Sequence, residues 1–264
     1  MTNHITLPTS IMETLPIDIL LYIIDLLAGR DDEDIKSLQI LSQTCKYMVP
    51  PCRKHLFSSI NLHSELNSVR FSNLLSKNPD IVLYVKSLRY RVSNLIIDHE
   101  LNILDMLKKR SSLQSIELWS SDLRCEWTTL AESIRSSLVS LIQLPTVTFL
   151  NIHSFNGFPE AALSGCSNLI DLQLGKLLKL VPSEVNQVIL RSKIPTPVSL
   201  DIKRKTYGLE ALLNSASLRA GDPIVDFSRL QKAQFYLGSR DVLVLANGLI
   251  KVTTLLEYLK IDGE

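Results

Sequence analysis

The residues that could catalyse a reaction or hold a metal ion are few and scattered in this chain. The five histidines are His4, His55, His63, His99 and His153, and no nucleophile near them is marked by a local motif. No G-x-S-x-G, H-E-x-x-H, G-x-G-x-x-G or G-x-x-x-x-G-K string is present. We therefore predict that the protein is not an enzyme and needs no cofactor. An α/β enzyme whose site is assembled from distant positions is kept as an alternative.

The cysteines point to the same conclusion. Cys45, Cys52, Cys125 and Cys166 show no C-x-x-C pairing, which argues against a structural zinc site. We expect reduced thiols in a cytoplasmic or nuclear protein, with Cys45 and Cys166 acting as small core residues. The amino-terminal residues lack the pattern of a signal peptide, and the apolar run that follows is too short to span a membrane. A net charge of +1 does not indicate binding to nucleic acid or to an anionic membrane.

Binding chemistry is better supported, at the helix predicted for residues 15–27. Its sequence, LPIDILLYIIDLL, carries apolar side chains around the whole helix and not along one stripe. A helix that is apolar all round must be buried all round, yet a segment ending near residue 56 is roughly the size at which a domain struggles to build its own core. We expect another protein to cover part of this helix.

A second amphipathic helix is predicted to follow it. Residues 31–34, with the sequence DDED, place negative charge at its start, where the helix dipole favours it. Pro50 and Pro51 are predicted to stop this helix. Its apolar face is formed by residues at spacings of three and four, namely Ile35, Leu38, Leu41, Cys45 and Met48.

Taken in order, the Leu15-Pro16 pair, the apolar helix, the acidic turn and the second helix resemble an F-box. Two features depart from the family pattern. Many members carry tryptophan at the position of Tyr47, and the turn at residues 29–33 is a few residues longer than usual. In this family the Leu-Pro pair and the first helices dock onto the Skp-type adaptor of a cullin-RING ubiquitin ligase. The resemblance implies an adaptor-binding role for Leu15, Pro16, Ile19, Leu20, Ile23, Ile35, Leu38 and Leu41. The alternative is a helical cap on the amino-terminal end of a larger domain.

Beyond residue 56 an internal repeat recurs, in which an apolar residue is followed three and five positions later by two more. Successive copies lie 22 to 34 residues apart, which accommodates one strand and one helix per repeat. The middle residues of the eight copies are Ile60, Leu88, Ile116, Leu150, Leu172, Leu200, Ala233 and Leu259.

Amphipathic segments lie between these triplets, at about residues 127–141, 181–189, 209–216 and 242–249. Alternating strands and helices predict an α/β fold, a parallel sheet with helices on its outer side, because parallel strands need a crossover connection. An ordinary two-layer α/β domain is an alternative to a repeat protein.

The triplets resemble the L-x-x-L-x-L core of leucine-rich repeats, and the HLFSSI string of residues 55–60 is similar to the junction in a large group of fungal F-box proteins. The resemblance implies an irregular solenoid with a curved parallel sheet over residues 57–264. It follows an F-box over residues 12–56 and a disordered tail over residues 1–11. The last triplet ends three residues before Glu264, so we expect a fragment or a final repeat that a partner caps.

In such a solenoid the residues between the triplet positions point to the open face of the sheet. They carry both charges and several aromatic rings, which suits a protein partner better than nucleic acid. The residues that we expect to bind a target are Arg89, Trp119, His153, Gln173, Lys203, Tyr236 and Tyr258.

The resemblance implies a substrate-recognition subunit of a Skp/cullin/F-box ubiquitin ligase, in which the F-box binds the adaptor and the repeats bind a target protein. The alternative is a leucine-rich-repeat interaction scaffold outside any ligase, with helices 15–56 as its cap. No nucleic-acid or membrane partner is expected.

Overall fold

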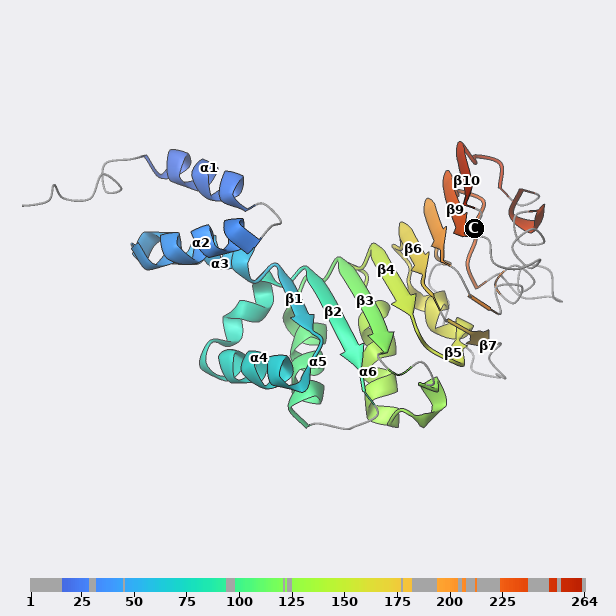
Figure 1. Ribbon diagram of the computed structural model, residues 1–264, viewed down its shortest axis with the longest axis horizontal. Coiled ribbons are helices and arrows are strands. Elements are labelled where there is room, and N and C mark those ends of the chain that lie inside the picture. Colours follow the sequence, from blue (N-terminus) through green and yellow to red (C-terminus); the bar gives the residue numbers. More distant parts are fainter. Residues whose placement is uncertain are drawn as a thin grey trace, which may run out of the picture. The chain divides into compact units, whose positions relative to one another are not determined.

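The computed structural model describes most of the chain, and its elements are shown in Figure 1. The residues it describes are 16–28, 32–44, 46–93, 98–120, 122, 125–176, 178–181, 194–203, 206–207, 212, 224–236, 247–250 and 253–262. The chain divides into two compact units, residues 1–58 and 59–264, and the boundary expected from sequence stood two residues earlier, after residue 56. The expected tail of residues 1–11, together with Leu15 and Cys45, lies outside the described residues.

The first unit is made of short helices around a small core. They are α1 (Ile17–Leu27), α2 (Asp32–Thr44), the 3-10 turn η2 (Lys46–Met48) and α3 (Val49–Leu56). The core is a cluster of buried side chains contributed by all four elements, namely Leu20, Ile24, Leu38, Leu41, Met48 and Cys52. The unit therefore buries one face of α1 by itself.

The prolines play a different role from the one predicted. Pro50 and Pro51 do not stop α2, which already ends at Thr44, but lie in the first turn of α3. Proline is tolerated there because the first backbone N–H groups of a helix have no partner within the helix. The prediction of a single helix that the prolines end was therefore wrong, because α2 ends at Thr44 and the prolines belong to the start of a separate helix, α3.

The second unit is a mixed α/β structure built on an eight-stranded parallel sheet. The strands follow one another in chain order across the sheet, and every neighbouring pair is parallel. They are β1 (Ser59–Leu62), β2 (Ser87–Val92), β3 (Ser115–Ser120), β4 (Phe149–His153), β6 (Asp171–Leu174), β8 (Ser199–Ile202), β9 (Lys232–Tyr236) and β10 (Tyr258–Asp262).

The register of this sheet confirms the strand positions predicted from the triplets. Ile60 pairs with Leu88, Leu88 with Ile116, and so on, until Ala233 pairs with Leu259. The eight middle residues of the triplets thus form one continuous row across the sheet. The row forms because each repeat places its apolar residues on the same side of its strand.

Helices cover one face of the sheet in its first half, as Figure 1 shows. These are α4 (Glu65–Lys77), α5 (Asp98–Arg110) and α6 (Glu132–Ile142), with the 3-10 turns η3 (Pro79–Tyr84) and η4 (Trp127–Thr129) between them. Ser64 is the N-cap residue of α4, and its side-chain oxygen accepts a hydrogen bond from the Asn67 N–H at 3.3 Å. The apolar residues of the strands, such as Leu88 and Tyr90 in β2, are buried against this helical layer.

The expected alternation of strand and helix is only partly observed. Between β4 and β6 the connection holds β5 (Phe158–Pro159) and the 3-10 turn η5 (Glu160–Gly165) instead of an α-helix. The sequence predicted that an amphipathic helix begins at Val181. In the structure this residue lies in the short strand β7 (Leu180–Val181), which pairs with β5. The rest of that helix, and most of those predicted over residues 209–216 and 242–249, lie outside the described residues. No helix in the described part of the chain is long and apolar enough to cross a membrane.

Candidate functional site

The first unit exposes a large set of apolar side chains on the helices that enclose its core. Tyr47 is 81% exposed, Ile40 65% and Leu26 64%, although isoleucine and leucine usually pack inside. The full set is Ile17, Ile19, Leu21, Tyr22, Leu26, Ile35, Ile40 and Tyr47, and we call it the apolar helix surface. Exposed apolar side chains that gather on one part of a protein are a common feature of protein interaction sites.

The structure separates the eight predicted adaptor-binding residues into two groups. Ile19 and Ile35 belong to the apolar helix surface, Pro16 is exposed and Ile23 is half-buried. Leu20, Leu38 and Leu41 instead lie in the core of the unit, where they hold α1 and α2 together. Their side chains support the surface from beneath and do not form part of it. Leu15 lies outside the described residues.

Contacts at both ends of α1 hold this helix in place. The Pro16 carbonyl accepts hydrogen bonds from the N–H groups of Ile19 and Leu20, at 3.1 and 3.2 Å, and so starts the helix. At its other end, Asp25 Oδ1 lies 2.9 Å from Nε2 of His55 on α3. Both contacts fix the direction in which the exposed residues of α1 point.

The second candidate surface is the face of the sheet opposite α4, α5 and α6, which we call the open face. Along β2 and β3 the buried residues alternate with Arg89, Arg91, Glu117 and Trp119. The strand register arranges the open-face residues in rows, and two of these rows hold most of the predicted target-binding residues. One row is Asn61, Arg89, Glu117, Asn151, Gln173, Asp201, Gln234 and Lys260; the other contains Arg91, Trp119 and His153, and farther along Tyr236 and Asp262.

Near β2 to β4 the open face carries an aromatic platform with charged neighbours. The rings of Trp119 and His153 are stacked, with centroids 6.0 Å apart and planes 13° apart. Glu117 lies between the side chains of Arg89 and His153. Its Oε2 is 3.1 Å from Nε of Arg89, and its Oε1 is 3.5 Å from Nε2 of His153. Three of the seven predicted target-binding residues, Arg89, Trp119 and His153, thus form one cluster.

A second cluster lies near β8 to β10. Nζ of Lys203 is 2.7 Å from Asp201 Oδ2 and 4.5 Å from the ring centre of Tyr236. Burial lowers the pKa of Lys203, but the hydrogen bond and the charge of Asp201 outweigh it, so the net pKa is raised. Gln234 donates from Nε2 to the Tyr236 hydroxyl at 2.8 Å and to Asp262 Oδ2 at 3.1 Å. The side chains of this cluster therefore hold one another in place.

The remaining two predicted target-binding residues are separate from these clusters. Gln173 lies between Asn151 and Asp201 in the first row, half-exposed, and joins neither group. Tyr258 is 50% exposed on β10 and pairs with Lys232, outside both rows. Sequence reasoning placed the triplet residues of β1 to β9 on the buried face correctly, but in β10 Leu259 and Ile261 are 39% and 40% exposed. It also could not tell which side chains of a row contact one another.

The described residues form no cluster that could hold a metal ion. Three or more histidine, cysteine, aspartate or glutamate side chains do not gather anywhere in this part of the chain in a way that could hold a metal ion. Cys52, Cys125 and Cys166 are free and buried, and burial raises the pKa of the Cys166 thiol to about 12, which keeps it unreactive.

Sequence reasoning missed several residues of interest. Ile17 and Ile40 belong to the apolar helix surface but lie outside the faces considered in advance. A signal for Ile40 existed, because it lies between Leu38 and Leu41 and must point away from the core that they share. Arg70 and Asn67, which line a groove beside β1, carried no signal at all.

Comparison with protein-family models, curated proteins and solved structures finds no match for this chain.

Proposed function

We propose that the chain is the substrate-recognition subunit of a Skp/cullin/F-box ubiquitin ligase. In this proposal the first unit is an F-box that docks on a Skp-type adaptor through the apolar helix surface. The second unit is an irregular leucine-rich-repeat solenoid that holds a target protein on its open face. The chain itself makes and breaks no bond. It brings the target near the site of ubiquitin transfer, where proximity raises the rate.

The observation that carries the proposal is the apolar helix surface. Among its described residues, the first unit encloses a cluster of six apolar side chains and leaves eight large ones exposed to solvent. Covering an apolar side chain of this size contributes about 1.5 to 3 kcal/mol, so four or five of them are enough to offset the cost of association. The order of the Leu-Pro pair, the apolar helix and the acidic turn gives the partner its proposed identity.

Support for target binding comes from the open face. Its Trp119–His153 platform and the Lys203–Tyr236 pair are aromatic and cationic groups held in fixed positions by neighbouring charges. Aromatic rings held in this way are the usual anchors of protein interfaces. The eight strands in chain order support the repeat interpretation.

A second candidate function is an interaction scaffold outside any ligase, in which the first unit is only a cap. The closed cluster around Ile24 favours it, because the unit holds its own core without a partner.

The experiment that separates the two is capture of a purified Skp-type adaptor by Ile19→Asp. Ile19 is 45% exposed, so the variant is expected to fold. In the complex with the adaptor the aspartate charge is buried without a partner, which weakens adaptor binding by more than about 100-fold. The matched control is Leu83→Asp, which places the same charge on an exposed leucine of the second unit and leaves adaptor binding intact. Equal capture by both variants, or no capture by the unaltered chain, rejects the ligase proposal.

A further inference from the structure

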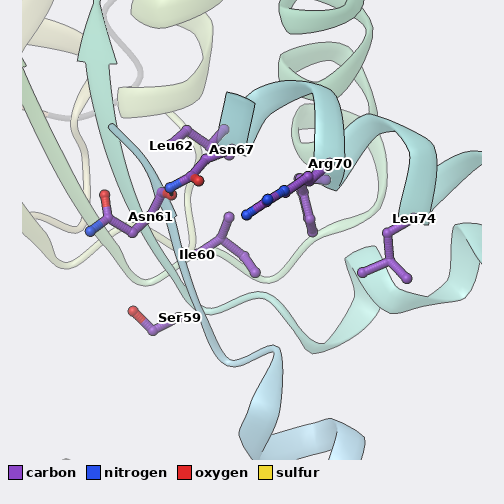
Figure 2. Close-up of a pocket in the computed structure, with 8 residues that line it drawn as sticks. Ser59, Ile60, Asn61, Leu62, Asn67, Arg70 and Leu74 are labelled. Carbon is purple, nitrogen blue, oxygen red and sulfur yellow. Dashed lines mark hydrogen bonds between the residues drawn. The ribbon is translucent and has the colours of Figure 1, made fainter. Parts of the chain in front are cut away.

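A groove runs along the free edge of the sheet, between strand β1 and helix α4. Its volume is about 260 Å³, and all its lining residues come from these two elements. Ile60, Phe71 and Leu74 supply an apolar floor, and Asn61, Asn67 and Arg70 supply polar groups. Figure 2 shows the Arg70 side chain reaching from α4 back toward β1, across the mouth of the groove.

The wall of the groove that β1 forms is an unpaired strand edge. Strand β1 pairs with β2 on one side, and no described strand pairs with its other side. In a parallel sheet alternate residues direct their peptide groups to opposite sides, so half of those in β1 point into the groove. Asn61 is one of these residues, and its carbonyl accepts a hydrogen bond from Asn67 Nδ2 at 3.3 Å, which an added strand has to replace. The strand has the sequence SINL and carries neither the lysine nor the proline that commonly blocks an edge.

Arg70 adds an uncompensated positive charge to the groove. Its guanidinium is exposed and has no ion pair with any described residue. An arginine keeps its charge at any physiological pH and offers five N–H donors in a planar fork that matches a carboxylate. The described groove lining holds no acidic side chain that could serve as that partner. A partner of complementary charge must bring the carboxylate itself.

We propose that this groove binds an extended segment of another protein, which adds to the sheet beside β1 and places an aspartate or glutamate on Arg70. The volume is below the range of about 300 to 1,000 Å³ that small-molecule pockets occupy, whereas an added strand needs only a shallow channel with main-chain hydrogen bonds. An apolar side chain of the segment rests on Ile60, Phe71 and Leu74. The groove lining shares Asn61 with the open face and no residue with the apolar helix surface, and binding at the groove does not depend on the ligase proposal.

The test is selection of random 12-residue phage-displayed peptides on the full-length chain and on Arg70→Glu. Peptides selected on the unaltered chain are expected to share an acidic residue beside an apolar one, and those selected on Arg70→Glu a basic residue at the same position. The matched control is Arg110→Glu, an exposed arginine at the end of α5, which should select the same acidic peptides as the unaltered chain. Arg70 is exposed, so the variant is expected to fold, and its thermal unfolding is compared with that of Arg110→Glu.

Two measurements on a synthetic consensus peptide complete the test. Arg70→Gln should raise its Kd by about tenfold or more, as loss of a charge-assisted pair does, and Arg110→Gln should not. Peptide binding should slow hydrogen exchange at the amides of Ser59 and Asn61, and methylating alternate backbone nitrogens of the peptide should abolish binding. Selected peptides without an acidic residue, identical peptides on Arg70→Glu, or unchanged exchange in β1 would each overturn the proposal.

Discussion

Glu100 is a carboxylate enclosed by the second unit and held by two hydroxyl groups. It is 5% exposed and accepts hydrogen bonds from Ser68 Oγ at 2.9 Å and from the Tyr90 hydroxyl at 2.8 Å. The three side chains come from α5, α4 and β2, so the network ties two helices to the sheet. Burial, together with the nearby Glu100 charge, raises the pKa of Tyr90, which keeps the phenol protonated and able to donate.

Removing the phenol should therefore destabilise the second unit. We expect Tyr90→Phe to lower its free energy of unfolding by about 1.5 to 3 kcal/mol, the range for a lost hydrogen bond to a charged group. Urea unfolding followed by tryptophan fluorescence measures this, because Trp119 and Trp127 both belong to the second unit. Tyr84→Phe is the control, since the Tyr84 ring is only half-buried. In a Glu100→Gln background the loss caused by Tyr90→Phe should shrink, and an undiminished loss would show that the hydrogen bond is not its cause.

At the scale of elements, the approach of β4 to the segment just after β6 depends on a glycine. A Cβ atom at Gly175 would lie 2.2 Å from Cβ and 3.3 Å from Cα of His153, distances that no rotation of the histidine relieves. The Gly175 N–H donates to the Ile152 carbonyl at 2.8 Å, which continues the ladder between the two strands. The absence of a side chain at Gly175 also leaves room for the His153 ring that stacks on Trp119.

Gly175→Ala should push the two strands apart locally. Overpacking of this kind costs about 1 to 3 kcal/mol, and the native fluorescence of Trp119 should change because its stacked neighbour moves. Urea unfolding and the emission spectrum of the folded protein measure the two effects. A His153→Gly/Gly175→Ala double variant, which removes the clashing Cβ, should recover part of the stability that Gly175→Ala loses. Failure to recover any would place the strain elsewhere.

At the scale of the whole molecule, the chain consists of two units with separate cores. Ile24 is fully buried in the first unit, and Trp127 is buried in the second, where its ring lies 4.7 Å from that of Phe158. Every residue of the apolar helix surface belongs to the first unit, and every residue of the open face to the second.

Ile24→Asp should unfold the first unit and leave the second intact. A charge without a partner at a fully buried site costs about 4 kcal/mol or more, which is a large part of the total stability of a small domain. Far-UV circular dichroism should show the loss of helix, while the urea midpoint reported by the two tryptophans stays unchanged. Ile19→Asp, on the exposed side of the same helix, should keep its helix content. A tryptophan midpoint that falls with Ile24→Asp would show that the two units unfold together.

Much of the sheet could be predicted from the sequence. The triplets located all eight strands and their register, including the weak copy around Ala233, because an apolar residue at every second position marks the buried side of a strand. The same alternation assigned Arg89, Trp119 and His153 to the open face. The helices were predicted less well, since a proline such as Pro50 can either end a helix or begin one, and only the preceding turn decides which.

The order of apolar and polar residues along the chain was enough to locate the strands. Only the tertiary structure decided that Leu20 and Leu38 lie inside the first unit while Ile19 and Ile40 lie outside, that Gly175 makes room for His153, and that Arg70 faces an unpaired strand edge. The physical reason is the range of the interactions. Alternation acts between residues close in the chain, whereas burial and pairing depend on partners brought together from distant positions when the chain folds.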